Sequence, residues 1–129
     1  VYIGHIGDSR IYRIRKKIIR KLTVDDSYVQ KLVKDGTITK EEAKHHPKKN
    51  MLMKALGCTS FVEPIVAVKG FLEDDVIVIT SDGLTNMVSD EEMLAIIENN
   101  VEKASDELIK KANEAGGLDN ITVVIVSKR

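Results

Sequence analysis

The sequence is short of cysteine, of net charge and of long apolar runs. Cys58 is the only cysteine among 129 residues, so no disulfide can form within the chain, and a reducing compartment is expected. Twenty Lys and Arg residues balance twenty Asp and Glu residues, which leaves no global field to attract nucleic acid or an anionic membrane. The longest apolar runs, such as 76–79, are far too short to span a bilayer, and no signal peptide opens the chain. We therefore expect a cytoplasmic protein whose partners include neither nucleic acid nor a membrane.

The charge that is present is unevenly distributed. Residues 1–21 hold seven Lys and Arg against Asp8 alone, whereas residues 70–129 hold thirteen Asp and Glu against five Lys and Arg. An acidic C-terminal portion suits cation binding better than phosphate binding. With 43% hydrophobic residues, the chain can bury the modest core of one ordinary domain, which excludes disorder.

The first third of the sequence has the pattern of strands followed by short helices. Alternating, β-branched segments at 1–6, 11–15 and 18–22 predict an antiparallel meander, with a basic turn at Lys16-Lys17. Helical spacing begins at Ser27, and a second short helix is predicted to open at a Thr39-x-x-Glu42 capping box and to end at Pro47. Because the chain opens without Met, directly on a strand, we expect that further sequence precedes it.

The rest of the sequence alternates between apolar strands and amphipathic helices. Strands are predicted at 62–68, at 76–80 as a run buried on both faces, and at 121–126 as a final buried strand. Between them, helices are predicted from a capping box at 89–92 through Ile97 and over 104–115. The sequence has no internal repeat and no low-complexity tract.

Three aspartates stand in Gly-containing turns beside apolar strands: Asp8, Asp82 and Asp119. Hard divalent cations such as Mg²⁺ and Mn²⁺ prefer carboxylate ligands, so each aspartate is a candidate metal ligand. Each is also an ordinary turn former, whose side chain bonds nearby backbone N–H groups without any metal. For any one of them taken alone, the turn interpretation is the stronger.

An ordered series of motifs along the whole chain is more specific than any single aspartate. The motifs are Gly7-Asp8-Ser9-Arg10, Leu22-Thr23-Val24-Asp25, the segment 36–43 leading to His46-Pro47 and Asn50, Ala55-Leu56-Gly57, the segment 81–85 and the segment 117–122. This series resembles the PPM family, the type 2C metal-dependent protein phosphatases, and its bacterial members in particular. The resemblance implies an α+β fold, a four-layer α-β-β-α sandwich with two antiparallel sheets. Residues 1–129 would form only the C-terminal part of that domain, so the fold would be incomplete.

The resemblance also implies an activity and a set of site residues. The activity is hydrolysis of phosphoserine and phosphothreonine in proteins, which reverses Ser/Thr kinase action in bacterial signalling, by a water that two Mn²⁺ or Mg²⁺ ions activate. By the family's roles, Asp82 and Asp119 are ligands of the metal pair, and Asp8 is a partner of Asp82 at a third, weaker site. Asn120 shapes the same cleft, and Ser81 and Gly83 support the ligands. Neither Cys58 nor a serine is needed as a nucleophile.

The segment of about 27–56 corresponds to the family's flap, an element that borders the active cleft and contacts protein substrate. His46 could contact substrate or transfer a proton, and Lys48 and Lys49 could contact a phosphopeptide. An exposed histidine without a catalytic task and two solvated lysines are the competing interpretations.

Several family motifs are absent from this sequence: the Arg that grips the substrate phosphate, a Glu near it, and the Asp-Gly pair whose aspartate bridges the metals. We therefore predict that no catalytic set is complete within the chain and that the chain alone is inactive. A half sandwich exposes strand edges, so a dimer, a swapped assembly or a complementary N-terminal half is expected. The alternatives to an enzyme fragment are a non-catalytic regulatory or interaction module and a weak metal sensor.

Overall fold

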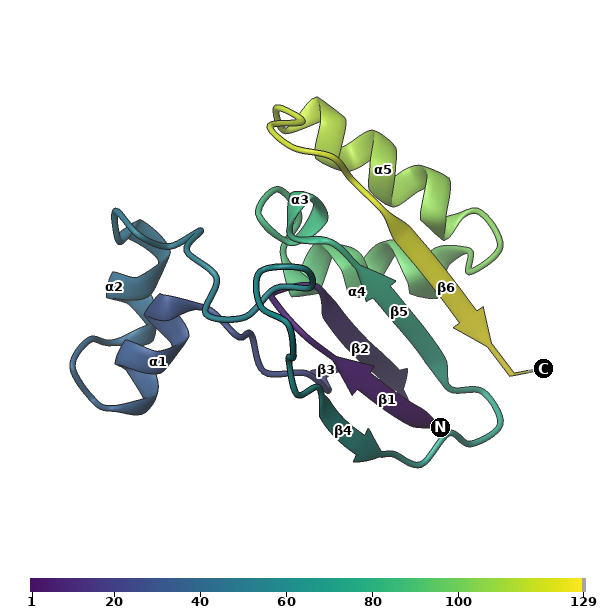
Figure 1. Ribbon diagram of the computed structural model, residues 1–129. Helices are drawn as coiled ribbons and strands as arrows, with labels where there is room; N and C mark the ends of the chain where they lie inside the picture. The colour runs from purple at the N-terminus through teal and green to yellow at the C-terminus, as the bar shows by residue number, and fades with distance from the viewer. Residues whose placement is uncertain (129) are drawn as a thin grey trace. The chain divides into compact units, whose positions relative to one another are not determined.

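Strand β5 lies inside a four-stranded antiparallel sheet. In the computed structural model, which describes residues 1–128, β5 (Val76–Thr80) pairs with β2 (Arg10–Arg15) on one side and with β6 (Val123–Ser127) on the other. Strand β3 (Ile18–Lys21) completes the sheet beyond β2, in the order β3-β2-β5-β6 (Figure 1). The run of β-branched residues in β5 favours this extended, doubly paired conformation.

The basic turn between β2 and β3 is confirmed as a two-residue hairpin. Lys16 and Lys17 have φ of +49° and +61°, and Arg15 pairs with Ile18 across the turn. A turn with positive φ at both central residues matches the right-handed twist of the flanking strands, although side chains other than Gly and Asn adopt it at a cost. The backbone is therefore locally strained at these two exposed lysines.

We expect Lys17→Gly to raise the free energy of unfolding by about 1 kcal/mol, because glycine adopts positive φ without steric cost. Urea unfolding of the two proteins measures the difference. Lys17→Ala is the matched control, since it removes the charge but keeps the Cβ atom, and it should give no such gain. Equal gains from both variants would mean that charge, not backbone conformation, is responsible.

Three helices cover one face of the four-stranded sheet, and together with it they form one compact unit. They are α3 (Asp82–Thr85), α4 (Asp90–Asn99) and α5 (Ala104–Glu114). The predicted capping box at the start of α4 is confirmed by reciprocal hydrogen bonds between Ser89 and Glu92. Apolar side chains from this face of the sheet and from the helices form the core: Tyr12, Ile14, Val78, Leu84, Val88, Met93, Ile97, Ala104, Leu108 and Ala112.

The prediction that β5 is buried on both faces is wrong, and so is the prediction that the last strand, β6, is buried. Val124 and Val126 of β6 are 47% and 43% exposed, and Ile79 of β5, which pairs with Val124, is 38% exposed. Successive side chains of a strand point to opposite faces, and the helices of this unit pack on the other face. An unbroken apolar run thus indicates that both faces of the strand are apolar. It does not indicate that the same compact unit buries both faces.

The expected meander of three consecutive strands is also wrong in one respect. Strand β1 (Tyr2–His5) does not pair with β2 but with β4 (Ile65–Val68), in a separate two-stranded antiparallel sheet. The β4 strand begins later than the predicted 62–68. The second edge of β2 is instead occupied by β5, which offers a longer register of β-branched partners.

Residues 1–8 and 24–69 form a second compact unit, distinct from the one built on residues 9–23 and the described part of 70–129. Besides β1 and β4 it holds α1 (Tyr28–Lys34) and α2 (Lys40–His45), so it contains the whole predicted flap of about 27–56. Ser27 caps α1, and the predicted capping box of Thr39 and Glu42 at α2 is confirmed. The N-terminal amino group of Val1 donates to the carbonyl of Lys69, 2.7 Å away, beyond the end of the β1–β4 pairing.

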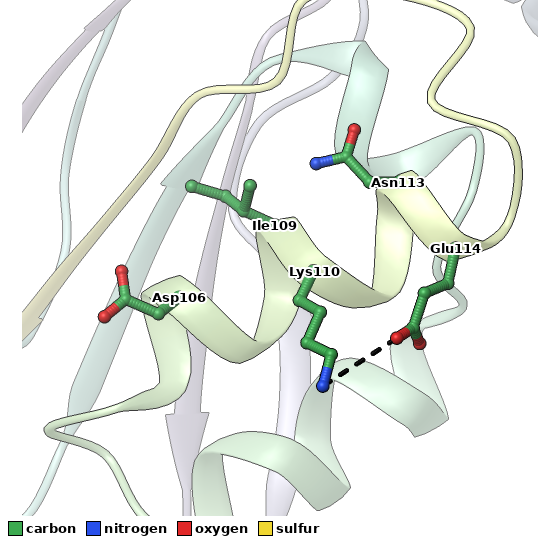
Figure 2. Close-up of a pocket in the computed structure, with 5 residues that line it drawn as sticks. All are labelled: Asp106, Ile109, Lys110, Asn113 and Glu114. Carbon is green, nitrogen blue, oxygen red and sulfur yellow. Dashed lines mark ion pairs between the residues drawn. The ribbon is translucent and has the colours of Figure 1, made fainter.

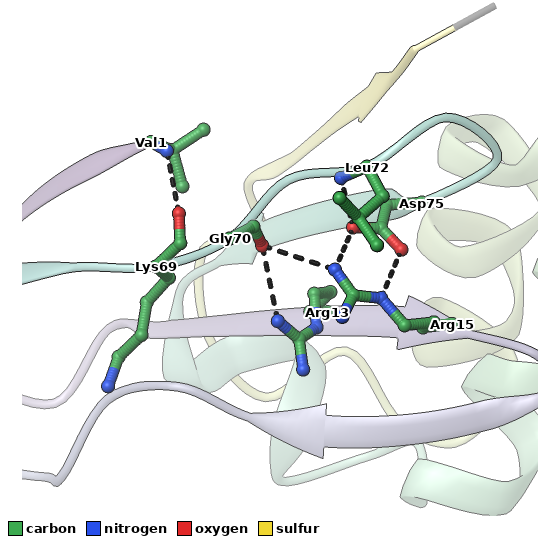
Figure 3. Close-up of polar contacts among 7 residues, drawn as sticks. All are labelled: Val1, Arg13, Arg15, Lys69, Gly70, Leu72 and Asp75. Atoms are coloured by element: carbon green, nitrogen blue, oxygen red, sulfur yellow. Dashed lines mark hydrogen bonds and ion pairs between the residues drawn. The ribbon is translucent and has the colours of Figure 1, made fainter.

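A buried carboxylate ties the loop before β5 to β2 (Figure 3). Asp75 is 1% exposed and accepts hydrogen bonds from Arg15 Nε at 2.7 Å, from Arg15 Nη2 at 2.6 Å and from the N–H of Leu72 at 2.7 Å. The hydrogen bond from Arg15 is the main reason why the pKa of the Asp75 carboxyl falls to about 2, against the opposing effect of burial. Charge-assisted bidentate pairs of this kind are among the stronger protein hydrogen bonds.

Because the folded pKa of Asp75 lies below the ordinary value of 3.8, its contribution to stability is complete above that value and is lost as the pH falls through about 2. We expect Asp75→Asn to cost about 2 kcal/mol at pH 6, and the difference from wild type to shrink between about pH 4 and pH 2. Urea unfolding at several pH values measures it. Asp74→Asn, at an exposed neighbour with φ of +65° that asparagine tolerates, is the control and should stay close to wild type. A constant difference across this pH range would contradict the assignment.

The α+β class with antiparallel sheets, predicted from the sequence, is confirmed. Within residues 1–128, every helix is too short or too polar to cross a membrane.

Candidate metal centre

The end of β5 and the segment before β6 are joined through Ser81. Its Oγ donates to the carbonyl of Asn120, 3.2 Å away, and accepts from the N–H of Thr122 at 3.1 Å, while its own N–H donates to the carbonyl of Thr122 at 3.2 Å. Ser81 is also the residue before α3, and its side chain makes no cap to that helix. Ser81 therefore bridges two chain segments that are distant in sequence, and its role in supporting metal ligands stays a prediction.

Gly83 allows these two segments to approach each other closely. A Cβ atom added at Gly83 would overlap the carbonyl oxygen of Asn120 and would lie 3.0 Å from its carbonyl carbon. Both obstacles are backbone atoms, which cannot swing away as a side chain can. Only glycine fits at this position of the structure as it stands, and the glycine of the Ser-Asp-Gly motif has a steric reason.

This close approach brings together the backbone segments that carry Asp82 and Asp119. Asp82 is the first residue of α3 and is half-buried. Asp119 is exposed, directly precedes Asn120, and accepts the N–H of Asn120 on Oδ1 at 2.7 Å. Two carboxylates carried by adjoining backbone segments are the donor chemistry that Mg²⁺ or Mn²⁺ requires. The chemistry of the two side chains therefore suits part of a divalent metal site.

Asp8 belongs to the other compact unit, where it follows β1 and is half-buried. The preceding Gly7 has φ of +92°, and its carbonyl accepts the N–H of Asp26 at 2.8 Å. Across residues 1–128, His, Cys, Asp and Glu side chains form no group of three that could hold a metal by itself. The role of Asp8 as a ligand therefore stays a prediction, as do those of Asp82 and Asp119.

The three predicted substrate-binding residues lie together at the end of α2. His46 is the C-cap residue of α2, and its Nδ1 accepts the N–H of Lys48 at 3.0 Å. The His46 ring lies 6.1 Å from the ring of Tyr28, and Lys48 Nζ lies 5.4 Å from the centre of the same ring. Lys49 is exposed next to them. Their contact with a substrate stays a prediction.

Thr80 is a residue of the site that the sequence reasoning did not single out. It is 2% exposed, and its Oγ1 lies 3.0 Å from the carbonyl of Thr122, to which it donates. It strengthens the bridge that Ser81 makes. The available signal was its position as the one polar residue of an otherwise apolar strand, immediately before the Ser-Asp-Gly motif.

A shallow depression on α5 has no connection with these residues. It is lined by Asp106, Ile109, Lys110, Asn113 and Glu114, all from the one helix, and Lys110 pairs with Glu114 at 3.9 Å (Figure 2). A hollow formed by a single helix surface lacks the convergent walls of a ligand site.

Comparisons with known proteins point to a family of phosphatases. The family model described as Protein phosphatase 2C matches residues 59–121, which include Gly83 and Asn120. The serine/threonine phosphatase stp of Listeria monocytogenes is 43% identical over 130 residues, which cover 99% of this chain and 52% of that protein. The chain thus spans about half the length of the curated relatives it matches.

Solved structures give the same result for the fold. The serine/threonine phosphatase PstP/Ppp of Mycobacterium tuberculosis is 40% identical with a TM-score of 0.90, over 96% of this chain and 53% of that one. The catalytic domain of PstP in complex with two manganese ions is 38% identical with a TM-score of 0.85, over 96% of this chain and 51% of that one. In sequence and in fold, the chain is similar to protein phosphatases of the 2C type over nearly its whole length.

Proposed function

We propose that the protein to which this chain belongs removes phosphate from phosphoserine and phosphothreonine in proteins, using two or three Mn²⁺ or Mg²⁺ ions. The observation that carries the proposal is the contact of Gly83 with Asn120, which brings together the backbone segments that carry Asp82 and Asp119. The similarity to bacterial serine/threonine phosphatases over nearly the whole chain, one of them solved with two manganese ions, supports the same chemistry.

Each residue of the junction has a role in this proposal. Asp82 and Asp119 supply the negative charge and the oxygen ligands that hold the cations. Ser81 fixes the start of α3 against the segment before β6, and Gly83 leaves room for the carbonyl of Asn120. When bound, divalent ions lower the pKa of a water molecule and neutralise charge on the phosphoryl group. Asp8 would add a carboxylate for a third ion.

The site in this chain would be partial. The motifs that grip the substrate phosphate and bridge two metals are not in the sequence, so the chain alone should be inactive. Its apolar faces support the same idea: Tyr2, Val66 and Val68 of the β1–β4 sheet are 87%, 68% and 66% exposed. The part of the protein that corresponds to the other half of the relatives is the proposed cover for these faces.

The test compares the natural gene product with the 129-residue chain produced alone. The proposal expects the gene product to hydrolyse para-nitrophenyl phosphate and a phosphothreonine peptide with Mn²⁺, and to lose this activity in EDTA. The chain alone should give no turnover and should self-associate on size-exclusion chromatography. Activity of the gene product that survives chelation would contradict the metal mechanism. A gene product that binds Mn²⁺ without turnover would favour the regulatory or sensor alternatives.

A further inference from the structure

The segment after α2 carries basic residues and no acidic ones. Residues 44–54 contain four lysines and two histidines and neither Asp nor Glu. We refer to residues 44–49 of this stretch as the flap lysine turn. Its backbone is folded by hydrogen bonds from the N–H of Lys49 to the carbonyl of His46, at 3.1 Å, and from the N–H of Met51 to the carbonyl of Lys48, at 3.0 Å. The positive charges are thus held on an ordered turn.

Two of the four lysines are engaged by carboxylates and two are not. Lys44 contacts Glu41 at 2.7 Å, and Lys54 lies 4.0 Å from Asp26. Lys48 and Lys49 are exposed, and neither forms an ion pair within the part of the chain that the structure describes. Their two charges are therefore available to an anionic partner.

An aromatic ring lies under the charge of Lys48. Tyr28 is half-buried. The centre of its ring lies 6.1 Å from the centre of the His46 ring and 5.4 Å from Lys48 Nζ. Because His46 Nδ1 accepts the N–H of Lys48, its proton is on Nε2, which leaves that nitrogen as a donor. A cation, a ring N–H donor and an aromatic ring are thus grouped on one turn.

Exposed apolar side chains continue this surface. Met51 is 50% exposed and Met53 45%, and the carbonyl of Met51 accepts the N–H of Tyr28 at 2.8 Å, which holds the strand-like segment beside Tyr28. Methionine adapts its shape to different partners, so it suits a surface that must accept variable sequences. The partner chemistry that matches such a surface is an acidic peptide that also carries apolar residues.

We infer that the flap lysine turn (residues 44–49), with Tyr28 and Met51, binds an acidic stretch of a protein substrate, close in sequence to the phosphorylated residue. The inference rests on the proposed function only in taking the partner to be a phosphoprotein substrate. Charge complementarity selects Asp and Glu in the partner, and the Tyr28 ring orders Lys48 so that less conformational freedom is lost on binding. The consequence is a preference among substrates, separate from the hydrolytic chemistry.

The test is fluorescence anisotropy with the natural gene product and labelled phosphothreonine peptides, in EDTA so that bound metal contributes neither affinity nor turnover. One peptide has Asp and Glu around the phosphothreonine, and a second has Lys at the same positions. The acidic peptide should bind about tenfold more tightly. Lys48→Glu with Lys49→Glu should remove about fivefold to tenfold of that affinity, whereas Lys103→Glu with Lys128→Glu, the same charge change at exposed sites of the other unit, should change it less than twofold.

Equal affinity for the acidic and lysine peptides, or equal losses from the two double variants, would overturn the inference. Tighter binding to phosphatidylserine vesicles than to the acidic peptide would overturn it as well, in favour of a membrane. Hydrolysis of para-nitrophenyl phosphate, measured on the same wild-type preparation with Mn²⁺, keeps the two hypotheses apart. A protein that hydrolyses it but shows no peptide preference loses only this inference, whereas one that prefers the acidic peptide without hydrolysis loses only the proposed function.

Discussion

Replacing Gly83 by alanine should destabilise the protein by about 2–3 kcal/mol and displace the candidate metal ligands, because the new methyl group has no space. It would overlap the carbonyl oxygen of Asn120, and the obstacle is backbone. The segment before β6 would have to move away from α3, which breaks the hydrogen bonds of Ser81 with Asn120 and Thr122. Urea unfolding measures the loss of stability, and calorimetric titration with Mn²⁺ measures the loss of metal affinity.

Gly4→Ala is the matched control for this experiment. Gly4 lies in β1, and a Cβ atom there would meet no atom within 4 Å. The same chemical change should therefore be neutral or slightly stabilising, because alanine restricts the unfolded chain more than glycine does. If both variants unfold at the same urea concentration as wild type, then the junction is loose enough to accommodate a methyl group, and the steric argument for the motif fails.

Asp119→Asn and Asp82→Asn should each lower the phosphatase activity of the gene product by about 100-fold or more, with little change in stability. Asparagine keeps the shape of the side chain and an oxygen that can accept the N–H of Asn120, so the local turn should survive. What is lost is one negative charge and one carboxylate ligand, and even the loss of a residue that merely supports a ligand commonly costs 10- to 100-fold. The readouts are kcat/KM and Mn²⁺ affinity, with urea unfolding as the check on folding.

Asp106→Asn serves as the control for the aspartate variants, because Asp106 is an exposed carboxylate on α5, away from the β5–α3 junction in sequence. It should retain wild-type activity and Mn²⁺ affinity. Full activity in Asp119→Asn would instead support the turn interpretation, in which the hydrogen bond to Asn120 is the entire role of this side chain.

Features that depend on neighbouring residues could be predicted from the sequence. The capping boxes at Thr39 and Ser89 were found because the interacting groups are three residues apart. The turn at Lys16-Lys17 was found because two alternating runs flank it. In each case the hydrogen bonds are local, so a pattern in a short window contains all the information.

Features that depend on distant segments could not be predicted in the same way. The pairing of β1 with β4, and the exposed face of β6, are set by which segments meet in the folded chain, and periodicity carries no record of that. The short helix α3 was missed because four residues are too few to show a period. The association of Asp82 with Asp119 was predicted only through the resemblance to a family, since each aspartate alone has the sequence of a turn.

The central claim is that Asp82 and Asp119 are ligands of one metal centre, and crystals of the gene product grown with Mn²⁺ test it most directly. Anomalous diffraction at the manganese absorption edge locates the ions independently of any assumption about ligands. The account predicts anomalous peaks in direct contact with the carboxylates of Asp82 and Asp119. Peaks elsewhere, with Asp119 bonded only to the N–H of Asn120, would contradict it.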